Sequence, residues 1–71
     1  MTAQELKEWF DGRELPAETV WIHKSMKVDD PKRFVELHFN SMDADGNERA
    51  NEPLILRLLL MKKWLEENGH A

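Results

Sequence analysis

The sequence lacks several residue types on which common functional sites depend. Its 71 residues include no cysteine, which excludes disulfides and thiolate metal sites. The three glycines are isolated from one another, so no glycine-rich loop that cradles a phosphate is present. The most apolar stretch, "PLILRLLLMKKWL", is interrupted by Arg57, Lys62 and Lys63. It falls short of the roughly 20 apolar residues that a membrane-spanning helix needs.

The chain also lacks an excess of positive charge, since its 10 lysines and arginines are outnumbered by 14 aspartates and glutamates. The formal net charge is −4, whereas nucleic-acid binding needs a basic surface. The one basic cluster, Lys24, Lys27, Lys32 and Arg33, is too sparse to supply that surface. The N-terminus, "MTAQELKEWF", has neither the basic start nor the apolar run of a signal peptide. We therefore expect a cytoplasmic protein with no nucleic-acid, membrane or known small-molecule partner.

The N-terminal part of the sequence predicts a short helix and then an extended segment. Thr2 followed by Glu5 has the spacing of a capping box, and Gly12 fits the stop, because glycine takes a positive φ without strain. Residues 19–28, "TVWIHKSMKV", alternate between apolar and polar side chains, which is typical of a strand. Lys24 interrupts the apolar face and allows two short pieces. Such pieces pair with each other, pair with another copy or stay irregular.

Two further helices are predicted downstream. Asp30 can cap the second helix with Pro31 as its first residue, and that helix ends near residues 41–44. The third helix is predicted to begin near residues 51–53 and to stop at Gly69. Its apolar side chains form three stripes: Leu54, Leu58, Met61 and Leu65; Leu56, Leu60 and Trp64; and Ile55 with Leu59. A helix this apolar on all sides is buried on more than one side.

The expected fold is mostly α. Residues 1–71 form a single compact three-helix domain in which an extended segment, residues 19–28, lies between helices one and two. Two companion helices can leave one stripe of helix three uncovered, and an uncovered apolar stripe usually marks a partner surface. The interface residues that we predict are Leu56, Leu60, Trp64 and Trp21. The alternative is that the three tryptophans stabilise the small core.

The loop "SMDADGNERANE", residues 41–52, has nearly the spacing of a calcium-binding EF-hand loop. Gly46 would supply its turn, and its candidate ligands are Ser41, Asp43, Asp45, Asn47 and Glu52. A serine at the first position and the lack of a second loop speak against calcium. The alternative is a polar helix–helix connection whose residues serve turn geometry.

His38 lies in the apolar face of the second helix, among Phe34, Phe39 and Met42. A histidine can act as a base, a proton sensor or a ligand, but here no second histidine follows one turn later. Ser41 alone lacks an orienting acid and oxyanion donors. We expect His38 to be structural, with its ring hydrogen-bonded to a backbone carbonyl. Because no acid, base and nucleophile are combined, we expect neither an enzyme nor a cofactor.

Five segments along the chain, taken together, carry a family resemblance. They are "ELKEWF", "ELPAETV", "DDPKRFVELHFNSMDA", "GNE" and "RLLLMKKWL". The chain resembles a family of small bacterial proteins of about this length, known only as a domain of unknown function. In the family pattern a proline precedes the glycine of the loop, where Asp45 stands here. The resemblance implies a helical fold and no chemistry.

These patterns favour a non-enzymatic protein–protein interaction or structural module. We expect it to self-associate through helix three, so that its partner is another copy or another protein. The alternative function is a calcium- or ligand-responsive helix–loop–helix built on residues 41–52.

Overall fold

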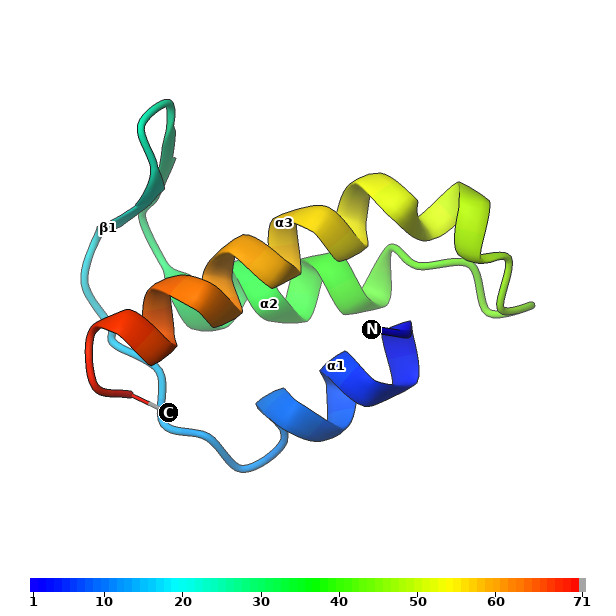
Figure 1. Cartoon of the computed structure of the whole chain (residues 1–71), viewed down its shortest axis with the longest axis horizontal. Coiled ribbons are helices and arrows are strands. Elements are labelled where there is room, and N and C mark those ends of the chain that lie inside the picture. The colour runs from blue at the N-terminus through cyan, green and yellow to red at the C-terminus, as the bar shows by residue number, and fades with distance from the viewer. Residues whose placement is uncertain (71) are drawn as a thin grey trace.

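The computed structural model describes residues 1–70 and contains three helices and one β-hairpin (Figure 1). In chain order the elements are α1 (Ala3–Phe10), β1 (Val20–His23), β2 (Met26–Val28), α2 (Pro31–Asn40) and α3 (Glu48–Glu67). The predicted three-helix architecture is therefore present. The predicted extended segment, residues 19–28, contains both strands, and these pair as a two-stranded antiparallel sheet.

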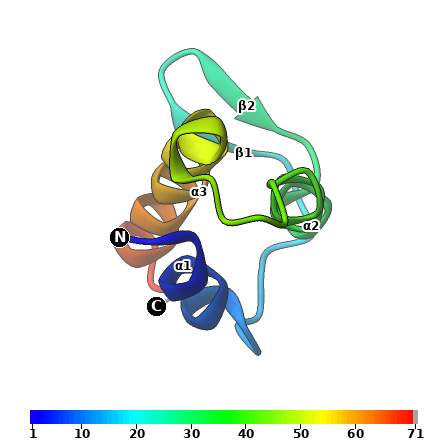
Figure 2. The same cartoon turned by 90° about the vertical axis from the view of Figure 1, so that its right-hand side faces the viewer.

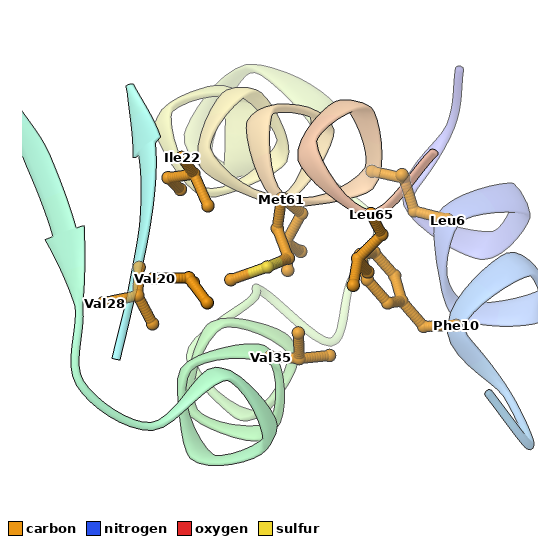
Figure 3. Packing of buried hydrophobic residues seen from close by; sticks show 9 residues of the cluster. Leu6, Phe10, Val20, Ile22, Val28, Val35, Met61 and Leu65 are labelled. Carbon is orange, nitrogen blue, oxygen red and sulfur yellow. The ribbon is translucent and has the colours of Figure 1, made fainter. Parts of the chain in front are cut away.

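α3 is the central element of the fold, because α1, α2 and β1 all pack against it. In a view along α3, the hairpin lies on one side of this helix, α1 on the opposite side, and α2 faces it between them (Figure 2). Side chains from all these elements converge on Met61 and Leu65 (Figure 3). The buried core consists of Leu6, Phe10, Val20, Ile22, Val28, Val35, Leu58, Met61 and Leu65.

Local side-chain signals determine where α1 and α2 begin. The Thr2 hydroxyl accepts from the Glu5 N–H at 3.2 Å, and the Glu5 carboxylate accepts from the Thr2 N–H at 3.2 Å. The Thr2 N–H and, after it, the Thr2 hydroxyl donate to the Glu5 carboxylate and hold the pKa of Glu5 below its usual value. Asp30 caps α2 by accepting from the Arg33 N–H at 3.2 Å, with proline at the first turn as predicted. After α1, Gly12 has φ of 73°.

The hairpin follows the alternation in its sequence. Val20 pairs with Val28 across the strands, and both are buried against α3 and α2. Trp21 pairs with Lys27 on the opposite, exposed face. Lys24 lies in the turn between the strands, which explains why it interrupts the apolar pattern. The two short pieces thus pair with each other within the chain, which is one of the three predicted outcomes.

The predicted start of helix three, near residues 51–53, is wrong. α3 begins at Glu48, where Asn47 caps it by accepting from the Ala50 N–H at 3.3 Å. Asn51 lies inside the helix with 3% of its surface exposed, and its side-chain oxygen accepts from the Asp43 N–H at 2.7 Å. Pro53 is also internal. The cap and the Asn51 bond stabilise the first turn enough for the helix to continue through a proline that donates no hydrogen bond.

The predicted end of α3 is confirmed. Gly69 has φ of 79°, and the His70 N–H donates to the Leu65 carbonyl at 2.8 Å. This is the hydrogen bond of a Schellman motif, which closes a helix with a glycine in the left-handed region. Among residues 1–70, none of the helices combines the length and the apolar character needed to cross a membrane.

Candidate interaction surface

α3 has two apolar stripes that differ in exposure. The buried stripe, Leu58, Met61 and Leu65, is 0% exposed and faces the core. The outer stripe, Leu56, Leu60 and Trp64, spans roughly 80° of the far side at about 100° per residue. Within residues 1–70, no helix or strand covers the side of α3 that points away from α2 (Figure 2). Leu54, which the sequence grouped with the buried stripe, is only half-buried, and Leu60 and Trp64 of the outer stripe pack partly against the core.

Exposure differs along the outer stripe. Leu56 is 55% exposed, which is high for a leucine in the longest helix, whereas Leu60 and Trp64 are half-buried. The Trp64 ring stacks on the His70 ring with centroids 5.7 Å apart. The residues after the helix thus shield one flank of Trp64, and Leu56 is the open part of the stripe.

Charged side chains border the outer stripe at both ends. Arg49 and Glu52 are exposed at its N-terminal end, and Lys63 and Glu67 are exposed at its C-terminal end. An apolar centre with a polar border is the usual arrangement of a protein–protein interface. The sequence pattern alone did not single out these four charges.

The three tryptophans lie in different surroundings. Trp21 is 58% exposed on the solvent face of β1, so it lies on a different element from the outer stripe. Trp9 packs against the core, and its ring is flanked by the Arg13 guanidinium at 3.9 Å and the Lys62 ammonium at 5.1 Å. Sequence reasoning missed both cation–π contacts: Arg13 follows Trp9 by four residues just after α1, whereas Lys62 approaches from α3.

The loop at residues 41–52 uses several of its oxygens for its own geometry. The Asp43 carboxylate accepts from the Asp45 N–H at 2.9 Å, and Asn47 caps α3 as described above. Gly46 has φ of 75°, the left-handed conformation that an EF-hand loop also needs at this position.

The remaining candidate ligands belong to the flanking helices. Ser41 is the C-terminal cap of α2, and Glu52 lies in the early part of α3. Within the described residues, no three His, Asp or Glu side chains are grouped so as to hold a metal ion. Calcium binding by this loop stays a prediction.

His38 makes the hydrogen bond that the sequence led us to expect. Its Nδ1 lies 2.7 Å from the Phe34 carbonyl, and since a carbonyl only accepts, the proton must be on Nδ1. Nε2 is buried and has no hydrogen-bond partner among the described atoms. Burial, followed by the nearby Arg57 charge, lowers the pKa of His38 despite that hydrogen bond. The fold therefore favours the neutral ring, and a structural role for His38 stays a prediction.

A concave feature lies between α1 and α2. A groove of about 330 Å³ has an apolar floor of Phe10, Val35 and Phe39, with Lys7 and Lys32 among the residues that line it. A neighbouring hollow of about 480 Å³ extends it toward residues 42–44. Sequence reasoning missed this groove because it results from the spacing of two helices packed on a third.

Comparison with known proteins places the chain in a family without giving it a function. No curated protein and no solved structure matches it. The outer stripe, the buried stripe and the loop all fall inside the one region that is matched. That region is residues 1–67, which match the domain of unknown function DUF6965; this confirms the family resemblance, and the chain belongs to that family.

Proposed function

We propose that the chain is a non-enzymatic association module that binds another copy of itself through the outer stripe of α3. The observation that supports this function is the 55% exposure of Leu56 in the middle of the central helix. Burying apolar surface contributes about 25 cal/mol per Å². Burying exposed Leu56 and the open part of half-buried Leu60 against a partner would therefore contribute to the free energy of binding.

Leu56, the most exposed member of the outer stripe, lies outside the core of one copy. Leu58, Met61 and Leu65 on the opposite side of α3 are fully covered by α1, α2 and the hairpin. Of the outer apolar side chains, Leu60 and Trp64 pack partly against that core, and Leu56 lies outside it. Their presence on a rigid helix, with charges at both ends, supports a surface that is completed by a partner.

Leu60→Glu is expected to abolish self-association and to preserve the helical structure. The carboxylate would have to be buried unpaired in the interface, which is costly. Sedimentation velocity at high micromolar concentration should show a dimer for the unaltered chain and a monomer for the variant, with the same circular dichroism. Leu56→Glu, at the more exposed position, should behave in the same way.

Leu37→Glu is the matched control for these variants. Leu37 is 50% exposed on α2, so it resembles Leu56 in type and exposure but lies outside α3. This variant should remain a dimer. A monomeric unaltered chain, or equal dissociation by Leu37→Glu and Leu60→Glu, would contradict the proposed function.

A second proposal is that the loop at residues 41–52 binds calcium. The positive φ of Gly46 at the sixth position supports it. Calorimetric titration with millimolar calcium should release heat from the unaltered chain and less from Asp45→Asn. Asp11→Asn, at another exposed aspartate, serves as control. Absence of any heat would end this proposal.

A further inference from the structure

We infer that the two copies pair through α3 in an antiparallel, two-fold arrangement in which Leu56 of each copy faces the partner's Leu60. This inference rests on the proposed function, since it specifies how self-association takes place. It follows from the spacing and the charges of the outward-facing residues of α3.

The outward-facing residues of α3 have the spacing of a coiled-coil seam. Successive members are separated by alternating steps of four and three residues, which places them on one side of a helix. All are exposed or half-buried, and Leu58 and Leu65 point to the opposite side. The members of this seam are Arg49, Pro53, Leu56, Leu60, Lys63 and Glu67.

The ends of the seam have opposite charges, and these decide the direction of pairing. In a parallel pair, Arg49 would face the partner's Arg49 and Glu67 the partner's Glu67. In an antiparallel pair with Leu56 opposite the partner's Leu60, Arg49 lies opposite the partner's Glu67. The same register brings Glu52 close to the partner's Lys63. Two-fold symmetry repeats each pair, so four complementary pairs replace contacts between like charges.

The centre of the same register is apolar. Each Leu56 meets the partner's Leu60, and each Pro53 comes beside the partner's Trp64. Leu59, half-buried at the edge of the seam, approaches its own copy near the two-fold axis. Arg57 also approaches its copy, at the other edge, where the exposed guanidinium groups can remain in water. Only one like-charge contact therefore opposes the four complementary ones.

Single cysteines at positions 53 and 63 test the arrangement directly, because the chain has no cysteine of its own. Pro53→Cys and Lys63→Cys face each other in the proposed register, so a mixture of the two should form a disulfide-linked heterodimer under mild oxidation. Either variant alone should not cross-link, since the two copies of one position lie about 15 Å apart along the helix axis.

The outcomes separate this inference from the proposed function. A monomeric unaltered chain would overturn both. If the unaltered chain is a dimer, cross-linking of Lys63→Cys with itself would overturn the antiparallel direction alone. A dimer whose mixed cysteine variants fail to cross-link would overturn the register alone.

Charge reversal gives an independent readout of the same arrangement. Arg49→Glu should raise the dimer dissociation constant about tenfold, because two attractive pairs become repulsive. The double variant Arg49→Glu with Glu67→Arg should return it to within about twofold of the original value. In a parallel dimer the single variant would leave the constant unchanged, and that result would overturn the inference.

Discussion

Leu58→Ala is expected to leave the chain largely unfolded at room temperature. Leu58 is 0% exposed in the middle of the central helix, and removing a buried leucine side chain to the β-carbon costs about 2–5 kcal/mol. A domain of this size has roughly 3–5 kcal/mol of net stability. The loss from this one substitution is therefore comparable to everything that holds the fold together.

Leu56→Ala is the matched control, because it makes the same chemical change two residues away on the same helix. Leu56 is 55% exposed, so this variant should change the free energy of unfolding by no more than about 0.5 kcal/mol. Urea denaturation followed by circular dichroism, at a concentration too low for association, measures both. Equal denaturation midpoints for the two variants would show that α3 does not face the core as described.

Asn51→Leu is expected to destabilise the fold by about 1–3 kcal/mol although it replaces a polar residue in the interior with an apolar one. The side-chain oxygen of Asn51 is the acceptor for the Asp43 N–H at 2.7 Å in a partly buried site. Without it, that backbone donor has no partner, and an unsatisfied buried donor costs an amount of this size.

The measurement is again the urea midpoint, with Asn40→Leu as control. Asn40 is exposed at the end of α2, so its replacement should have little effect. Faster amide exchange in residues 43–47 of Asn51→Leu should accompany the loss of stability, because this bond ties the loop to α3. A midpoint as high as that of the unaltered chain would refute the role given to Asn51.

Sequence reasoning predicted those parts of the fold that depend on short-range signals. The Thr2–Glu5 capping box, the Asp30 cap and the Gly69 stop each involve residues only a few positions apart. The alternation in residues 19–28 likewise indicated which side chains of the hairpin are buried. Such signals act within one or two turns and can therefore be recognised without knowledge of the rest of the chain.

The start of α3 was wrong because a long-range contact outweighs a local rule. Pro53 favours the first turn of a helix, and this preference pointed to residues 51–53 as the start. The structure instead uses Asn47 as the cap and Asn51 to bind the backbone at Asp43. The contact between Asn51 and the Asp43 backbone joins residues on the two sides of a loop, so the sequence around Pro53 does not indicate it.

For the interaction surface, the sequence indicated the stripe but not its border. Periodicity alone grouped Leu56, Leu60 and Trp64, and the structure places them on one side of α3. Trp21 was predicted to join them from the extended segment, and it lies on the exposed face of β1 in that segment. The predicted helix began after Arg49. The opposite charges of Arg49 and Glu67 at the two ends of α3 could therefore be compared only in the structure.

Leu56 and the fully buried side chains of α3 point to different sides of the helix, which separates two kinds of evolutionary change. Substitutions at Leu56 can alter the exposed surface without opening a void beneath Met61, and repacking around Met61 leaves Leu56 exposed. Positions that share no contacts have roughly additive effects on free energy. Descendants of one ancestral chain can therefore vary this exposed surface while they inherit the same scaffold.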